Sequence, residues 1–426
     1  MIRILVLSNP ADRAQALSLR ATAGTGPEVS VAVTAIIADV RARGDAAVRE
    51  LTERFDGARL ESMFLDEARW DALAARCPTP VREALALAHE RVRRFHEPQI
   101  PVSYSMELEG GGTLRSLTIP LRRAACYVPG GRAAYPSTVI MTAAVARLAG
   151  VPEVILATPP RRDGTILPEV AAAARLAGAT RILLAGGGQA VAALALGTGS
   201  VPRVDVIVGP GNAYVTEAKK QLSGEVRIDS LAGPTEVVIV ADSSADPRQV
   251  AADLVAQGEH DPLALGVLVT PDASLARRTV DALERELSEH PNPIAAESLG
   301  ARGAAVIARD LDEALAYADG LAPEHLELLL RDAPSALPKV PRAAAVFLGH
   351  HAPVPVGDYL AGPNHTLPTS GTARFASPLS ASDFVRRQNV IEYGPGQLAA
   401  DAGAIESLAR AEGLHGHARA VEVRRK

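Results

Sequence analysis

Short apolar runs alternate with helix-like segments along most of this 426-residue chain, and this alternation constrains the fold more than any other feature. Strands that alternate with helices form parallel sheets with crossover helices. Two series of strand-like runs are visible: 151–160, 181–187 and 204–212, and then 236–242, 265–271, 304–309 and 343–349. Because the chain is also too long for one hydrophobic core, we expect an α/β protein with two lobes.

Both ends of the chain are expected to be helical. Apolar residues recur at spacings of three and four over 29–55 and again over 80–96, the pattern of amphipathic helices. The glycines at 110–112 lie between two strand-like runs and predict a hairpin turn. The polar segment 379–426 is predicted to form a terminal helical segment.

Composition excludes several classes of protein. A net charge of −5 is opposite to the basic excess of nucleic-acid-binding proteins. No uncharged apolar stretch reaches the roughly 18 residues that a membrane-spanning helix needs, and the N-terminus lacks a signal-peptide pattern. Cys77 and Cys126 are too few for a disulfide scaffold and fit a reducing compartment. We therefore expect a cytoplasmic protein without nucleic-acid or membrane partners.

Glycine-rich turns follow several of the predicted strands, at 130–131, 186–188 and 209–212. The carboxyl ends of parallel strands are where α/β sheets bind ligands, and helix N-termini at such turns favour phosphate. None of the three turns has the G-x-G-x-x-G spacing, so each alone predicts only a tight turn between strand and helix.

Two pairs of polar residues have the chemistry of a catalytic site. Gln257 and His260 are three residues apart on a predicted helix, which places them on one face, and both side chains are acceptable zinc donors. Glu324 and His325 are adjacent groups suited to two proton transfers near neutral pH. Taken alone, the first pair is best explained by chance, and the second is equally consistent with a surface pair before a buried strand.

The histidines are unevenly distributed, because eight of the ten lie between His260 and His417. Together with Asp358 and His365, this skew indicates one site built from the second half of the chain. His350 and His351 add to the skew but are expected to be exposed loop residues.

Eight ordered segments resemble the histidinol dehydrogenase family over nearly the whole chain. They are YVPGG (127–131), GGGQAVAALALG (186–197), VGPGNAYVTEAK (208–219), DSLAGPTEVVIVAD (229–242), QGEHD (257–261), APEHLEL (322–328), GDYLAGPNHTLPTSGTARF (357–375) and EGLHGHARAV (412–421). Eight matches in the family's order are far more specific than any single motif.

The resemblance implies a role for each matching residue. The implied zinc ligands are Gln257, His260, Asp358 and His417, and the implied catalytic residues are Glu324 and His325. The implied substrate contacts are these four ligands and His325, with Thr235, Tyr359, His365 and Glu412. The implied NAD contacts are Tyr127, Gln189 and Asn212.

The resemblance also implies the architecture and the reaction. We expect two incomplete Rossmann-like domains with small helical terminal segments, assembled as an intertwined homodimer with shared active sites. The predicted division is 1–22, then 23–126 with 236–378, then 127–235, and a dimerisation segment 379–426. The implied reaction oxidises L-histidinol through L-histidinaldehyde to L-histidine in two NAD-dependent steps, the last step of histidine biosynthesis.

Some positions depart from the usual family pattern, and other functions remain possible. Thr235 stands where serine is frequent, Gly258 replaces alanine, the stretch 350–356 differs, and His415 lies close to His417. The alternatives are a paralogue acting on another small alcohol, a zinc hydrolase that needs no nucleotide, and a non-catalytic structural protein.

Overall fold

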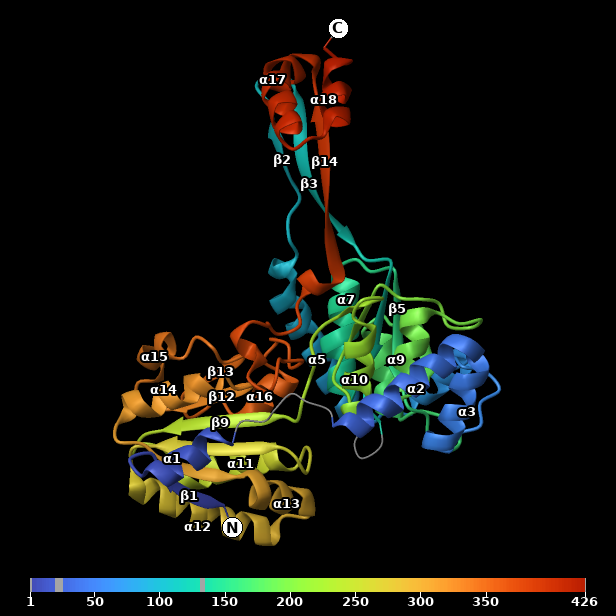
Figure 1. Cartoon of the computed structure of the whole chain (residues 1–426). Coiled ribbons are helices and arrows are strands. Elements are labelled where there is room, and N and C mark those ends of the chain that lie inside the picture. The colour runs from blue at the N-terminus through green and yellow to red at the C-terminus, as the bar shows by residue number, and fades with distance from the viewer. Residues whose placement is uncertain (1, 20–25, 131–134, 426) are drawn as a thin grey trace.

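The protein consists of two α/β lobes and an extended arm (Figure 1). A computed structural model describes residues 2–19, 26–130 and 135–425. Each lobe contains a parallel β-sheet, as the alternation of strands and helices predicts. Gly131 of the YVPGG motif lies outside the described residues.

The first lobe is built on a six-stranded sheet of order β1-β11-β10-β9-β12-β13, in which every neighbouring pair is parallel. Helices pack on both faces of this sheet, so alternate residues of a strand belong to two different apolar cores. In β9, Val238 packs against the helices of one face and Val237 against those of the other. The strands are β1 (Arg3–Val6), β9 (Glu236–Ala241), β10 (Leu265–Thr270), β11 (Ala304–Ile307), β12 (His325–Leu329) and β13 (Ala345–Leu348). The helices are α1 (Pro10–Leu17), α14 (Leu311–Leu321) and α15 (Ala333–Ala336) on one face, and α11 (Pro247–Gly258), α12 (Ala273–Glu289), α13 (Pro293–Arg302) and α16 (Val354–Tyr359) on the other.

The second lobe is built on a five-stranded parallel sheet of order β6-β5-β4-β7-β8. Its strands are β4 (Arg123–Tyr127), β5 (Glu153–Thr158), β6 (Arg181–Leu184), β7 (Val206–Val208) and β8 (Arg227–Ile228). One face packs on α4 (Glu67–Ala75), α5 (Thr79–His96), α6 (Pro136–Val139), α7 (Val145–Leu148) and α8 (Pro168–Leu176). The other face packs on α2 (Pro27–Arg43), α3 (Asp45–Asp56), α9 (Gly187–Leu196) and α10 (Ala213–Leu222).

The arm is a three-stranded antiparallel sheet that projects from the second lobe, with two helices at its tip (Figure 1). Its strands β2 (Tyr104–Glu107) and β3 (Gly112–Pro120) form the hairpin that the glycines at 110–112 predict. The third strand, β14 (Val385–Tyr393), pairs along the whole of β3, and α17 (Pro395–Ala411) and α18 (His415–Glu422) follow it.

The prediction of a wholly helical C-terminal segment is therefore wrong for β14. Only Val385 of its nine residues is buried, so the strand lacks the apolar alternation by which strands are recognised. Its pairing with β3 is a contact between distant parts of the chain, and no local pattern encodes such a contact. The helical prediction for 29–55 is confirmed except at Gly44, where the chain turns between α2 and α3.

The observed lobes also differ from the predicted division. The helices of 27–96 pack on the five-stranded sheet and not with 236–378, because apolar residues such as Val33 and Val92 join its two cores. The N-terminal segment is not separate either, since β1 pairs with β11 at the edge of the six-stranded sheet. Among the described helices, none is long and apolar enough to cross a membrane.

Candidate active site

Glu324 and His325 lie at the amino end of β12, beside the amino end of β9. His325 is opposite Val237 in the parallel register, which brings Thr235 and Glu236 next to the pair. Both Glu324 and His325 are buried, so the pair is not the exposed surface pair that the sequence alone also allowed.

The carboxylate of Glu324 is held through one of its oxygens. Its Oε2 accepts a 2.6 Å hydrogen bond from the hydroxyl of Thr235 and a 2.9 Å bond from the backbone N–H of Glu236. Burial raises the pKa of Glu324 to about 7, although these two hydrogen bonds oppose the shift. A carboxyl group with a pKa near neutrality is suited to general base catalysis.

The ring of His325 is held by the backbone carbonyl of Glu236, which lies 3.1 Å from Nδ1. Because a carbonyl only accepts hydrogen bonds, Nδ1 carries the hydrogen of the neutral ring and Nε2 carries the lone pair. Burial lowers the pKa of His325, which favours the neutral ring. Nε2 is therefore the atom able to accept a proton.

Gln257, at the end of α11, presents a free oxygen beside this pair. Its Nε2 donates a 2.6 Å hydrogen bond to the hydroxyl of Thr235. Its Oε1 is buried and has no hydrogen-bond partner among the described residues. Buried polar atoms are nearly always paired in folded proteins, so this oxygen is expected to bind a ligand or metal.

His260 lies beyond the end of α11, so the prediction that it shares a helix face with Gln257 is wrong. The helix ends at Gly258, and Pro262 disfavours helical geometry at the preceding residue. The ring is nevertheless oriented, because Nδ1 lies 2.9 Å from the backbone carbonyl of Ala256 and must donate to it. This leaves Nε2 available as a ligand, an arrangement typical of metal-binding histidines.

Asp358, on α16, is the charged group common to this cluster. Its negative charge raises the pKa of Glu324 and opposes the lowering of the pKa of His325 and of His365 by burial. His365 Nδ1 lies 2.9 Å from the backbone carbonyl of Asp358, and its Nε2 lies 3.2 Å from the hydroxyl of Thr138. Since Thr138 belongs to α6 of the other lobe, the site lies where the two lobes meet.

The donors of this cluster fit a zinc ion. An amide oxygen, an imidazole nitrogen and a carboxylate are available from Gln257, His260 and Asp358, and zinc accepts such nitrogen and oxygen donors. Within the described part of a single chain, no three His, Cys, Asp or Glu side chains form a group that would hold a metal.

Glu412 and His417 are not brought to this cluster. Glu412 follows α17 and His417 belongs to α18, both exposed at the tip of the arm and away from the lobes (Figure 1). Tyr359, beside Asp358, is close to the cluster but 58% exposed. The structure thus joins all the predicted residues of this site except the two on the arm.

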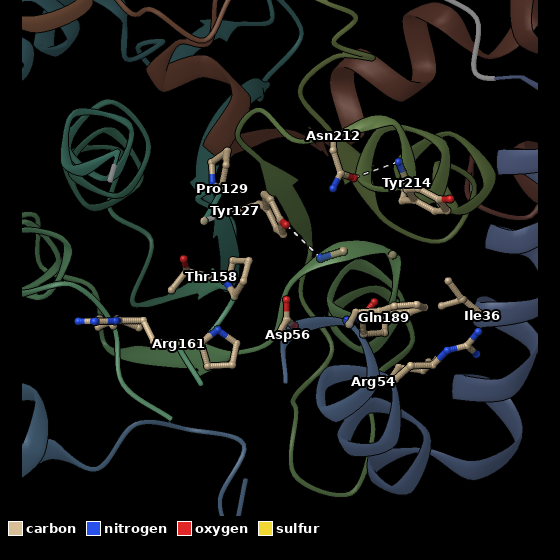
Figure 2. A pocket seen from close by; sticks show the side chains of 18 of the residues that line it. Ile36, Arg54, Asp56, Tyr127, Pro129, Thr158, Arg161, Gln189, Asn212 and Tyr214 are labelled. Carbon is tan, nitrogen blue, oxygen red and sulfur yellow. Dashed lines mark hydrogen bonds between the residues drawn. The ribbon is translucent and has the colours of Figure 1, made fainter. Parts of the chain in front are cut away.

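A second site opens at the carboxyl ends of the five-stranded sheet, where α/β sheets bind ligands. It is a pocket of about 1490 Å³, and Tyr127, Gln189 and Asn212 all line it (Figure 2). The hydroxyl of Tyr127 accepts a 3.0 Å hydrogen bond from the N–H of Gly187. Burial raises the pKa of Tyr127 to about 12, so this hydroxyl stays protonated and can donate to a ligand.

The turn after β7 fits closely against this pocket. Gly209 has φ +108°, and a Cβ there would lie 2.1 Å from the carbonyl oxygen of Tyr127. Only glycine allows this approach. Asn212 then caps the N-terminus of α10, and its side chain accepts hydrogen bonds from the N–H groups of Tyr214 and Val215.

Sequence reasoning missed Glu236, a buried carboxyl group next to Glu324 and His325. Its Oε1 accepts hydrogen bonds from the backbone N–H groups of Ser370 and Glu324, at 2.8 and 3.3 Å. Burial, together with the charge of Glu324, raises its pKa to about 7. The available signal was an acidic residue at the start of an otherwise apolar strand, 236–242.

A family model for histidinol dehydrogenase matches residues 20–425. The chain belongs to the histidinol dehydrogenase family. A histidinol dehydrogenase of Moorella thermoacetica is 50% identical over 399 residues, covering 93% of this chain and 94% of that one. A histidinol dehydrogenase of Synechococcus sp. is 48% identical over 397 residues and 92% of each chain.

A solved structure of the family confirms the fold. The crystal structure of histidinol dehydrogenase from Elizabethkingia anophelis matches with a TM-score of 0.92 and 31% identity, covering 99% of this chain and 98% of that one. Membership of the histidinol dehydrogenase family makes this chain an oxidoreductase, and the predicted α/β class with parallel sheets is correct.

Proposed function

We propose that this chain is a zinc- and NAD-dependent enzyme that oxidises L-histidinol to L-histidine, the last step of histidine biosynthesis. In the first step the alcohol loses a hydride to NAD and a proton to the protein, giving L-histidinaldehyde. In the second, water adds to the aldehyde, and the resulting hydrate loses a hydride to a second NAD and a proton to the protein, giving L-histidine. The observation that carries the proposal is the buried Glu324–His325 pair beside Gln257, whose amide oxygen has no partner.

Gln257, His260 and Asp358 are assigned to the metal, with His417 of the partner subunit as the fourth ligand. Zinc, when bound, supplies a Lewis-acidic anchor for the imidazole and amino nitrogens of histidinol. Thr235 orients the amide of Gln257 by accepting a hydrogen bond from its Nε2, which leaves Oε1 as the ligand atom. The neighbouring Tyr359 and His365, and Glu412 of the partner subunit, are assigned to the remaining polar groups of the substrate.

Two different atoms accept the two protons. His325 accepts the alcohol proton at Nε2, since its Nδ1 is bound to the carbonyl of Glu236. Glu324 accepts the proton of the attacking water at Oε1, because both of its hydrogen bonds are made by Oε2. General base catalysis of this kind contributes about 10²–10⁴-fold to a rate.

The pocket of the second lobe is assigned to NAD. The cofactor, when bound there, accepts the hydride in each oxidation. Tyr127 offers a protonated hydroxyl, and Gln189 offers an amide group with both donor and acceptor atoms. Asn212 offers its amide NH₂ as a donor, because its Oδ1 caps α10. The pocket is larger than the 300–1,000 Å³ typical of sites for drug-sized ligands, as an extended dinucleotide requires.

The working form is assigned as a homodimer with shared sites, in which each arm supplies Glu412 and His417 to the other subunit. The arm exposes large apolar side chains, among them Tyr104 at 59%, Ile391 at 73% and Leu408 at 66%. Such side chains gathered on one projection favour burial against a partner. A cytoplasmic location is assigned because Cys77 and Cys126 are both free thiols.

The test is the yield of NADH per L-histidinol consumed by the purified enzyme. The proposal expects a ratio of about two, with L-histidine as the product. A ratio near one would limit the enzyme to the first oxidation. Absence of NADH with L-histidinol, but not with another alcohol, would show a paralogue, and turnover without NAD would show a hydrolase.

A further inference from the structure

The pocket of the second lobe contains a carboxylate with one buried oxygen that receives no hydrogen bond from the described residues. Asp56, the last residue of α3, lines the pocket, and its Oδ2 is buried without a partner among the described residues. Figure 2 shows Asp56 beside Gln189, with its carboxyl group directed toward the side where Tyr127 lies. A buried oxygen that lost its water without gaining a donor destabilises the protein, so a ligand donor there would bind favourably.

No positively charged group of the described residues offsets the effect of burial on the pKa of Asp56. Burial raises the pKa of Asp56 to about 6, and its negative charge contributes to the raised pKa of Tyr127. Asp56 is therefore mostly ionised at neutral pH and only accepts hydrogen bonds. A hydroxyl group of a ligand is the complementary donor.

The same pocket contains three arginines that are free to bind anions. Arg54, Arg161 and Arg162 line it, and no ion pair or hydrogen bond joins their guanidinium groups to another described residue. Guanidinium groups are effective ligands for phosphate. The pocket thus offers cations for phosphates and, at Asp56, one acceptor that a phosphate cannot approach favourably.

The position of Asp56 decides which part of a dinucleotide it meets. The hydride must pass near His325, where the two lobes meet. Helix α3 lies on the side of the second lobe that faces away from the first lobe (Figure 1). Asp56, at the end of α3, therefore faces the adenosine half of a cofactor whose nicotinamide reaches the junction between the lobes.

We propose that Asp56 accepts a hydrogen bond from the 2′-hydroxyl of the adenosine ribose of NAD and thereby excludes NADP. In other dinucleotide-binding folds an acidic residue accepts a hydrogen bond from this hydroxyl, whereas an arginine accommodates a 2′-phosphate. NADP lacks the hydroxyl and places a phosphate against the carboxylate. The proposal rests on the proposed use of NAD at this pocket.

The test is calorimetric titration of NAD and NADP into the full-length protein and its Asp56→Asn and Asp56→Ala variants. A hydrogen bond to a charged group is worth about tenfold or more in affinity. We expect both variants to bind NAD about tenfold more weakly and NADP more tightly, so that the preference for NAD falls at least tenfold. Asp39→Asn is the matched control, because Asp39 lines the same pocket but both its oxygens accept hydrogen bonds from Arg43.

The outcomes separate this inference from the proposed function. A wild-type protein that binds NAD, with variants of unchanged preference, would overturn the role of Asp56 and leave the use of NAD standing. Loss of NAD affinity without any gain for NADP would overturn the assignment to the 2′-hydroxyl. A wild-type protein that binds neither nucleotide would overturn both proposals. The variants should fold, since removal of an unpaired buried charge does not break any hydrogen bond of Oδ2.

Discussion

The hydroxyl group of Thr235 donates a 2.6 Å hydrogen bond to Oε2 of Glu324. The same hydroxyl accepts a 2.6 Å hydrogen bond from Nε2 of Gln257. One side chain thus orients both the proposed base for the second oxidation and a proposed metal ligand. Serine provides the same hydroxyl, which explains why either residue is compatible with this position.

Replacement of Thr235 by valine should impair the site, whereas replacement by serine should not. Valine keeps the shape of threonine but leaves Glu324 and Gln257 without their shared partner. A buried hydrogen bond to a charged group is worth about 1.5–3 kcal/mol, so kcat should fall about tenfold or more. The measurement is kcat for L-histidinol with zinc content determined in parallel. Equal activity of the valine and serine variants would show that the hydroxyl has no role.

The substitution Glu324→Gln should impair the second oxidation more than the first, because only the second requires activated water. Oxidation of supplied histidinaldehyde should fall by about 10²-fold or more. Reduction of histidinaldehyde by NADH should persist, since it reverses the first step and uses His325. An equal loss in both directions would contradict the role assigned to Glu324.

A buried acid pair behind the site predicts a pH-dependent stability. Glu327 lies on β12, where its Oε1 accepts a 2.8 Å hydrogen bond from the N–H of Val354 at the start of α16. Asp253 of α11 contacts its carboxyl group. Burial raises the pKa of Glu327, and it raises the pKa of Asp253 to about 6. The pair therefore links the three elements that carry His325, Gln257 and Asp358.

Both acids have a higher pKa in the folded than in the unfolded chain, so they favour folding most at low pH. The contribution of Asp253 is complete below its unfolded pKa near 4 and is lost as the pH rises through about 6. The contribution of Glu327 is lost in the same direction, as the pH rises through its own raised pKa. The substitution Glu327→Gln keeps an acceptor for Val354 and adds a donor for Asp253. In urea unfolding, the free energy of unfolding of the variant should rise relative to that of wild type between pH 4.5 and pH 8. The exposed Glu61→Gln is the control, and an unchanged pH slope for Glu327→Gln would refute the pairing.

The α/β class and most strands could be predicted, because buried parallel strands are continuous apolar runs bounded by glycine and proline. The arm and the division into lobes could not. β14 is exposed along almost its whole length and is recognised only by its pairing with β3. Helices such as α5 carry an apolar stripe that would fit either sheet. Contacts between distant segments decide both questions.

The same distinction applies to the sites. Glu324 and His325 were found through the family motif, and their burial and partners follow from the register between β9 and β12. Asp56 belongs to no motif, and only the folded chain shows that it faces a pocket without a partner. A residue outside every motif, such as Asp56, is therefore missed by sequence patterns even when its unpaired atom is evident in the folded chain.

Chelation of the metal should abolish activity without unfolding the protein. Gln257 and Asp358 belong to elements that pack in an extensive apolar core, which includes Leu254 and Val354 and needs no metal. Proteins with such cores do not depend on metal for folding, unlike small zinc domains. Activity should vanish with a chelator and return with zinc, while the circular dichroism spectrum stays unchanged. Loss of the helical signal on chelation would contradict this prediction.

The last prediction concerns the subunit that supplies His417. Gln257, His260 and Asp358 lie together between the lobes, whereas His417 lies at the tip of the arm, which points away from them (Figure 1). If the arm reaches a second subunit, two different inactive variants should restore each other. We therefore expect a refolded equal mixture of His260→Ala and His417→Ala to recover activity that neither variant has alone.

The amount recovered follows from the symmetry of the dimer. In each mixed dimer, one site combines the lobes of the His260→Ala subunit with the arm of the His417→Ala subunit and carries both lesions, whereas the other site carries none. Random pairing makes about half of the dimers mixed, so about a quarter of wild-type activity should return. If each arm served its own subunit, every site would keep one lesion and no activity would return. Mass spectrometry establishes that mixed dimers have formed, and inactive mixed dimers would rule out the shared site.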